Sequence, residues 1–168
     1  MAKLIRIQRK RRRENRTDYE SRFSLLKSGV KRIAIRKTNR FILIQLVESK
    51  ESQDRVLNGI TSKLLISEGW SEKFSGALKS IPAGYLTGLL FAKKIDNKEK
   101  YIIDLGIARN KKGSRLYAAV LGLIDGGLNI CADKKVMPSK EDVEGKNVNP
   151  NLKEIIKKVK AKIVGGKK

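Results

Sequence analysis

The chain has 168 residues, of which 40% are hydrophobic, so it is long and apolar enough for one domain with a buried core and is not disordered throughout. Its formal net charge of +22 lies mainly at the two ends: residues 1–40 hold 15 Lys and Arg against 3 Asp and Glu, residues 146–168 hold 8 against 1, and residues 41–145 hold 16 against 13. This distribution favours a polyanionic partner, nucleic acid above all, while the lack of histidine and the single Cys131 exclude an intramolecular disulfide, a Cys/His zinc site and a histidine base.

Residues 1–17 form a basic arm that we expect to bind RNA. Guanidinium groups match phosphate oxygens in a bidentate way that a lysine ammonium cannot. Thr17 and Glu20 stand three residues apart and predict a capping box, which would start a helix here and fix the root of the arm. A solvated, disordered tail is the alternative interpretation of such a charge run. The arginines of the arm are Arg6, Arg9, Arg11, Arg12, Arg13 and Arg16.

The first helix is predicted from Asp18 to Lys27, because apolar side chains are spaced three or four residues apart on one face. These side chains are Tyr19, Phe23 and Leu26. Ser28-Gly29 follows and predicts the end of the helix, since glycine adopts the left-handed conformation without strain.

A basic hairpin is predicted next. Isoleucine alternates with other residues in the segment 32–36, which places the isoleucines on one face of a strand and Arg32 and Arg36 on the other. Residues 41–47 form a stronger apolar strand, and residues 37–40 form the exposed turn. We expect the basic face and the turn to lie on phosphates; an ordinary charged edge strand is the alternative.

The middle of the chain predicts a loop, a strand and a helix. The polar residues 48–54 indicate a loop, and residues 55–61 indicate a third strand. Trp70 lies in an apolar neighbourhood and is interpreted as a core residue rather than a base-stacking platform. Ser80, followed by Ile81-Pro82, predicts the cap of a buried helix over residues 83–94.

The last third of the chain holds a second candidate site. Residues 101–107 predict a buried central strand, and residues 116–125 predict an apolar helix. The loop 109–115 between them brings three or four cations to a helix N-terminus, where free N–H groups and the helix dipole favour phosphate. A lysine-rich helix is predicted over residues 151–162.

Seven pieces of this sequence occur together in one known family, in this order and at these spacings. They are Arg11-Arg12-Arg13-Glu14 with Thr17-Asp18-Tyr19, Leu25-Leu26-Lys27-Ser28-Gly29, Arg36-Lys37-Thr38-Asn39-Arg40, Gly69-Trp70, Gly84-Tyr85-Leu86-Thr87-Gly88-Leu89-Leu90, Asp104-Leu105-Gly106 and Lys112-Gly113-Ser114-Arg115. Over residues 9–145 the chain thereby resembles the large-subunit ribosomal protein L eighteen family in its archaeal form, a relative of the eukaryotic 5S-rRNA-binding protein.

The resemblance implies an α/β fold, a mixed β-sheet with helices packed on its faces in a ribonuclease-H-like topology. It also implies a structural protein of the large ribosomal subunit, in the cytoplasm, that binds 5S rRNA in the central protuberance and contacts large-subunit rRNA and neighbouring ribosomal proteins. No enzyme activity, cofactor, metal or small-molecule substrate is expected. Carried onto this sequence, the RNA-binding positions are Arg9, Arg11, Arg12, Arg13, Arg16, Thr17, Tyr19, Arg36, Thr38, Asn39, Arg40, Lys111, Lys112, Gly113, Ser114 and Arg115.

The expected organisation is a basic RNA-binding arm (1–17), a globular domain (18–145) and a lysine-rich C-terminal extension (146–168). A membrane protein is not expected, because no apolar run approaches the ~20 residues that span a bilayer. A signal peptide is not expected either, since the amino terminus lacks the necessary apolar stretch.

Two other functions remain open at this point. One is a general nucleic-acid-compacting protein, for which positive charge alone would suffice. The other is a metal-dependent nuclease, with Asp104 on the central strand and Asp125 or Asp133 as a two-metal carboxylate site. The single acidic residue on a strand argues against the nuclease.

Overall fold

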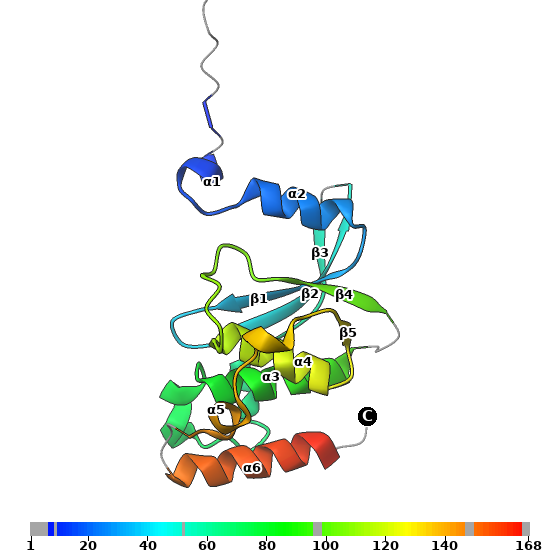
Figure 1. Cartoon of the computed structure of the whole chain (residues 1–168). Coiled ribbons are helices and arrows are strands. Elements are labelled where there is room, and N and C mark those ends of the chain that lie inside the picture. The colour runs from blue at the N-terminus through cyan, green and yellow to red at the C-terminus, as the bar shows by residue number, and fades with distance from the viewer. Residues whose placement is uncertain (1–6, 9, 52, 96–98, 147–149, 166–168) are drawn as a thin grey trace, which may run out of the picture.

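A mixed five-stranded sheet with helices on its faces forms the centre of the molecule in the computed structural model, which describes residues 7–8, 10–51, 53–95, 99–146 and 150–165 (Figure 1). The strand order is β3-β2-β1-β4-β5. The first three strands are antiparallel, whereas β4 is parallel to β1 and β5 is parallel to β4. The strands are β1 (Arg32–Lys37), β2 (Ile42–Lys50), β3 (Gln53–Thr61), β4 (Lys100–Asp104) and β5 (Asn129–Ile130). The predicted α/β class with a mixed sheet is confirmed.

The alternation in β1 is also confirmed. Ile33 and Ile35 are fully buried in the core that the sheet forms with the helices below it. The antiparallel partner β2 adds buried Ile42 and Ile44 to the same core. This arrangement leaves the arginines of β1 on the opposite face of the sheet.

The predicted loop over residues 48–54 is wrong. Strand β2 continues to Lys50 and β3 begins at Gln53, so the two polar strand ends pair with each other. Glu51, with φ of 49°, lies in the tight turn between them. Polarity alone is therefore a poor signal for a loop here, because an antiparallel ladder can extend beyond the part of the sheet that is covered by helices.

Helices α3 (Ile81–Lys94) and α4 (Arg115–Asp125) cover the lower face of the sheet in Figure 1. The Ser80 side chain accepts a hydrogen bond from the Ala83 N–H, which confirms the predicted cap of α3. Two short 3₁₀ helices, η1 (Ser62–Leu65) and η2 (Glu72–Ala77), precede it. Trp70 is confirmed as a core residue, 1% exposed, with its indole N–H donated to the Phe74 carbonyl.

Glycines allow α3 and α4 to pack with their backbones in close approach. A Cβ atom on Gly122 would lie 2.1 Å from the carbonyl oxygen of Tyr85 in α3. A Cβ atom on Gly88 would lie 2.2 Å from the carbonyl oxygen of Ala119 in α4. Each of these helices thus needs a residue without a side chain where it crosses the other.

The predicted lysine-rich helix is confirmed as α6 (Pro150–Gly165), which lies against α3 in the outermost layer (Figure 1). Its buried side chains recur at helical spacing and belong to the main core: Leu152, Ile156, Val159 and Ile163. Two short helices, η3 (Lys134–Val136) and α5 (Lys140–Glu144), connect β5 to α6.

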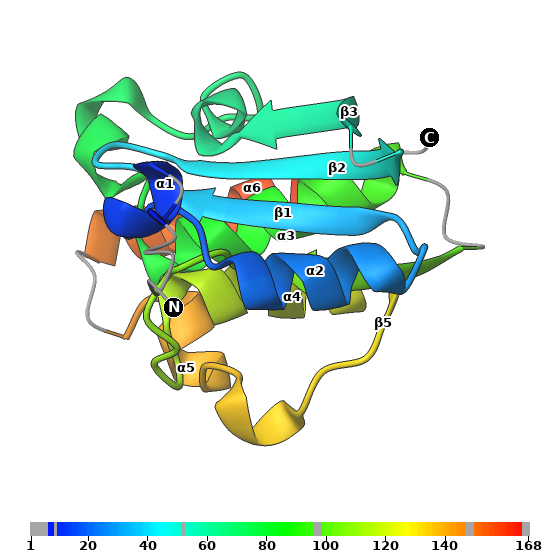
Figure 2. The same ribbon diagram turned by 90° about the horizontal axis from the view of Figure 1, so that it is seen from above.

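The opposite face of the sheet carries α2 (Tyr19–Lys27), preceded by the single turn α1 (Lys10–Arg13) (Figure 2). Helix α2 ends before Ser28, and Gly29 has φ of 64°, as predicted. The predicted apolar face of α2 is only partly correct, because Phe23 is 67% exposed while Tyr19 and Leu26 are half-buried. Within the described ranges, no helix combines the length and the apolar composition that a membrane crossing requires.

Candidate nucleic-acid interface

A basic groove lies between the arm, the end of β1 and the loop before α4. Its volume is about 1330 Å³. The described side chains that line it include nine arginines and lysines but only two aspartates, so the groove is strongly positive. The nine basic residues are Arg11, Arg16, Arg22, Arg36, Lys37, Arg109, Lys111, Lys112 and Arg115.

The arm is folded back on itself at its root. The Arg11 Nε donates to the Thr17 hydroxyl at 3.0 Å, and Asn15, with φ of 52°, lies in the turn between them. The predicted capping box of Thr17 and Glu20 is wrong, because Asp18 is the N-cap of α2 and accepts hydrogen bonds from the backbone N–H groups of Glu20 and Ser21. The Thr17 hydroxyl therefore does not cap α2 and instead accepts the hydrogen bond from Arg11 that folds the arm back.

The Asp18 cap explains the entry of the chain into α2. The Ser21 hydroxyl donates to Asp18 Oδ2 at 2.6 Å. This hydrogen bond, with those from the backbone, lowers the pKa of Asp18. The carboxylate also lies at the positive end of the helix dipole, where a negative charge is favourable.

The loop between β4 and α4 forms one wall of the groove. The predicted strand over residues 101–107 is too long, because β4 ends at Asp104 and the chain turns at Gly106, where φ is 63°. Ile107, predicted to be buried, is consequently 60% exposed. At the other end of the loop, Gly113 has φ of 65° and donates its N–H to the Val136 carbonyl at 3.0 Å.

The N-terminus of α4 borders the same groove. Ser114 is its N-cap residue by backbone conformation, but the hydroxyl makes no capping hydrogen bond. Within the described part of the chain, this hydroxyl oxygen is buried without a partner. The free N–H groups of the first helical turn and the surrounding cations together favour an anion at this position.

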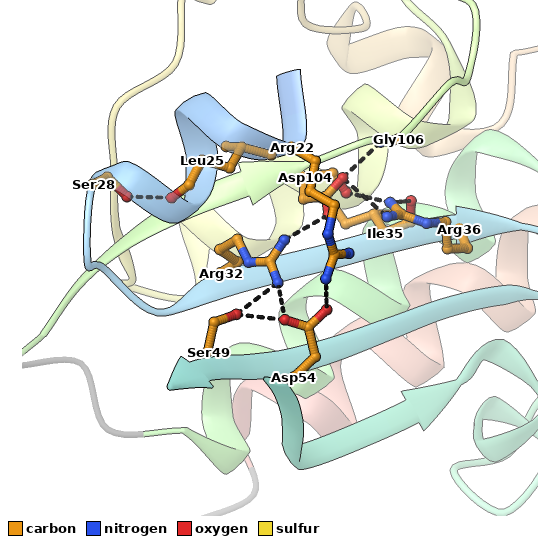
Figure 3. A network of polar contacts seen from close by, with 10 residues as sticks. All are labelled: Arg22, Leu25, Ser28, Arg32, Ile35, Arg36, Ser49, Asp54, Asp104 and Gly106. Carbon is orange, nitrogen blue, oxygen red and sulfur yellow. Dashed lines mark hydrogen bonds and ion pairs between the residues drawn. The ribbon is translucent and has the colours of Figure 1, made fainter. Parts of the chain in front are cut away.

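A network of ion pairs lies beneath α2 (Figure 3). Arg22 of α2 and Arg32 of β1 both pair with Asp54 of β3, at 2.8 and 2.7 Å. Arg32 also donates to the Ser49 hydroxyl and lies 3.5 Å from Asp104. Arg32 is only 3% exposed, so the prediction that it contributes to a phosphate-binding face is wrong.

The carboxylate of Asp54 holds two arginines from different elements. Burial alone would raise the pKa of Asp54. Hydrogen bonds from the Ser49 hydroxyl and Arg22, together with the positive charges of Arg32 and Arg22, outweigh burial, so the pKa of Asp54 is lowered. Asp54 is thus ionised at neutral pH and ties α2 to the sheet. This link sets the position of the helix above the groove.

Arg36 differs from Arg32 because its side chain remains 40% exposed. Its Nη1 donates to the backbone carbonyl of Asp104 at 2.6 Å, and its Nη2 donates to Asp104 Oδ1 at 2.9 Å. The carboxylate itself accepts the Gly106 N–H at 2.8 Å. Arg36 is therefore both a wall of the groove and a partner of Asp104.

The structure brings most of the predicted RNA-binding residues into one groove. Those that line it are Arg11, Arg16, Thr17, Arg36, Lys111, Lys112, Gly113, Ser114 and Arg115. Arg12 and Arg13 are exposed on α1, Tyr19 is half-buried at the start of α2, and Arg6 and Arg9 lie outside the described residues. The hairpin turn of Thr38, Asn39 and Arg40 is exposed but does not line the groove.

Thr38 has a structural role in that turn. Its hydroxyl accepts the Phe41 N–H and donates to the Phe41 carbonyl, both at 2.9 Å. These bonds close the turn between β1 and β2. Asn39 and Arg40 are the exposed residues that the closed turn presents.

One groove residue, Arg22, has no local pattern in the sequence that singles it out. Lys37 and Arg109 also line the groove; they lie in the predicted basic turn and in the predicted cationic loop, although they are not among the RNA-binding positions carried over from the family. The loop predicted over residues 48–54 includes Asp54, and the nuclease hypothesis gives Asp104 only the role of a metal ligand. The arginines on the α2 face of β1 are a usable signal, because buried guanidinium groups need acidic partners.

The carboxylates of the nuclease hypothesis make separate contacts. Asp104 is paired with Arg32 and Arg36, and the Asp133 side chain accepts the Lys135 N–H in η3. Asp125 accepts the Tyr85 hydroxyl at 2.9 Å; burial and this contact raise the pKa of Tyr85. Among the described residues, no group of three or more potential metal ligands occurs.

Comparison with known proteins gives the family. A family model described as "Ribosomal large subunit proteins 60S L5, and 50S L18" matches residues 3–102, more than half of the chain. The chain belongs to this family. The match contains most of the arm, α2 and the hairpin, and it ends within β4.

Curated relatives in the L18 family extend the similarity over most of the chain. The large ribosomal subunit protein uL18 of Methanoculleus marisnigri is 40% identical over 83% of this chain and 78% of its own length. The uL18 proteins of Methanoregula boonei and Methanococcoides burtonii are 37% and 39% identical over 89% and 92% of this chain, and over 87% and 91% of their own lengths. The resemblance to the archaeal form is confirmed.

Proposed function

We propose that this chain binds 5S rRNA in the large ribosomal subunit and helps to attach it to the large-subunit rRNA in the central protuberance. Membership of the L18 family makes it a ribosomal protein of the large subunit, which acts in translation in the cytoplasm. The observation that supports the finer proposal is the basic groove, because residues as far apart in the chain as Arg11 and Arg115 contribute cations to one surface.

The chemistry of the groove favours recognition of phosphates and of shape. In A-form RNA the major groove is deep and narrow, so a folded RNA presents its backbone more readily than its base edges. Aromatic residues make up only 5% of the chain, which argues against a stacking platform for single strands. Arg and Lys side chains on a preformed surface are suited to such a backbone.

Competition binding tests the proposal. Purified full-length protein is titrated with labelled 5S rRNA at moderate salt, and tRNA and duplex DNA are added as competitors. We expect 5S rRNA to be preferred by about a hundredfold or more, because binding by charge alone would not distinguish the three nucleic acids.

Equal competition by all three nucleic acids would overturn the proposal. In that case the charge of the groove would bind any polyanion, as expected of a nucleic-acid-compacting protein. Preference for tRNA over 5S rRNA would also contradict it, because the groove would then recognise folded RNA of another class.

A further inference from the structure

We propose that Asp104 is a positioning residue for RNA binding, although it is an acidic residue in a basic groove. It holds the Arg36 guanidinium so that the opposite edge of that group meets a phosphate oxygen pair. This inference rests on the proposed function and names one of the phosphate contacts within the groove.

The hydrogen bonds of Arg36 leave one edge of its guanidinium group for a ligand (Figure 3). Nη1 donates to the carbonyls of Ile35 and Asp104 at 3.1 and 2.6 Å, which uses both of its hydrogens. Nη2 donates to Asp104 Oδ1 at 2.9 Å. Within the described residues, Nε and the second Nη2 hydrogen have no hydrogen-bond partner, and these two parallel N–H groups form a bidentate donor edge.

Asp104 is itself held in place from two sides. It is 9% exposed, and its Oδ1 accepts the Gly106 N–H at 2.8 Å. Its Oδ2 lies 3.5 Å from Nη1 of Arg32, which is fixed in turn by Asp54. The carboxylate therefore has little freedom to follow a moving Arg36, and it orients that side chain instead.

Gly106 provides the space in which Arg36 lies. A Cβ atom at this position would come within 3.0 Å of Arg36 Cζ and 3.3 Å of its Nε. The positive φ of 63° also favours glycine. The turn after β4 thus serves two purposes: it ends the strand and it leaves room for the guanidinium.

Positioning and simple electrostatics predict opposite effects for the loss of Asp104. A negative charge in the groove repels phosphates, so its removal alone would strengthen RNA binding. An arginine held in its binding conformation loses less freedom when RNA binds, so the loss of its anchor weakens binding. The sign of the change in affinity decides between them.

The first experiment compares Asp104→Ala with wild type for 5S rRNA affinity at moderate salt, in the full chain. We expect affinity to fall about tenfold, the size of a charge-assisted hydrogen bond, although the net charge rises by one. The matched control is Glu144→Gln, which removes one negative charge from an exposed residue of α5 outside the groove. Its affinity is expected to be unchanged or slightly higher.

A double-mutant cycle then separates positioning from a structural role. Arg36→Lys keeps the positive charge but removes the bidentate edge. If Asp104 acts through Arg36, Asp104→Ala has no further effect on affinity in the Arg36→Lys background. Additive losses, or an Asp104→Ala variant that binds as tightly as wild type, would overturn the inference.

A second variant covers the case in which Asp104→Ala does not fold, since its partner Arg32 is buried. Gly106→Ala displaces Arg36 while the Asp104 carboxylate is retained. It should weaken RNA binding about tenfold when Arg36 is present and have no effect in the Arg36→Lys background. Circular dichroism and thermal melting verify folding. If the wild-type protein binds 5S rRNA selectively but the substitutions at Asp104 and Arg36 have additive effects on affinity, this inference alone is contradicted. If the wild-type protein binds without selectivity, the proposed function is contradicted.

Discussion

The Gly122→Ala substitution is expected to lower the free energy of unfolding by about 3 kcal/mol, the upper part of the range for overpacked cores. The added Cβ would lie 2.1 Å from the Tyr85 carbonyl oxygen and 2.9 Å from the Leu89 nitrogen. Both atoms belong to the backbone of α3, so no side-chain rotation can relieve the contact. The helices would have to move apart, which opens the core on either side of the contact. Urea denaturation followed by circular dichroism measures the effect.

The matched control is Gly76→Ala in η2. Nothing lies within 4 Å of the Cβ that this substitution adds. We expect the free energy of unfolding to change by less than about 1 kcal/mol, because the only contributions are a small loss of unfolded-state entropy and local backbone preference. If the two variants were equally stable, the close approach of α3 and α4 would be wrong.

RNA affinity is expected to depend steeply on salt, and the arm is expected to supply part of that dependence. If six to ten phosphates are contacted, affinity falls by about 10³ to 10⁵ between 50 and 200 mM salt. Removal of two phosphate contacts by Arg12→Ala with Arg13→Ala should reduce the slope of log affinity against log salt by about two. Both arginines are exposed on α1, so the melting temperature should not change.

A second pair of basic residues serves as the control for total charge. Lys134 and Lys135 are adjacent and exposed on η3, outside the arm and outside the positions that are expected to bind RNA. Replacement of both by alanine removes the same charge but should leave the salt slope nearly unchanged. Equal slopes for the two double variants would mean that affinity reports net charge rather than contacts of the arm. A large fall in melting temperature for the arm variant would mean that the arm is packed against the domain.

Much of the fold follows from local patterns that are visible in the sequence. Alternating isoleucines in residues 33–35 predicted a strand with one buried face. A serine cap followed by proline, an apolar run and a lysine-rich segment predicted the helices α3, α4 and α6. The cap of α3 at Ser80 and the end of α2 at Ser28-Gly29 were predicted from equally local signals. Such signals depend on the conformations of four or five consecutive residues, so they survive without knowledge of the tertiary structure.

Local reasoning failed where two interpretations had equal local support. Thr17 and Asp18 are both good N-cap residues, and only the folded backbone shows that Asp18 takes the role. The polar ends of β2 and β3 were assigned to a loop because their pairing satisfies no hydrophobic pattern. Strand β4 stops three residues before its apolar run does, because Gly106 turns the chain.

The positively charged segments, most of the core of the sheet and α3, and the family of the chain follow from the amino-acid sequence. Which arginines remain available to a ligand depends on the tertiary structure. Arg32 pairs with Asp54, 22 residues away, and is buried, whereas Arg36 pairs with Asp104, 68 residues away, and keeps one edge exposed. The physical reason is that periodicity and capping act between near neighbours in the chain. Ion pairs depend on distances in space, and folding alone sets those distances between residues so far apart in sequence.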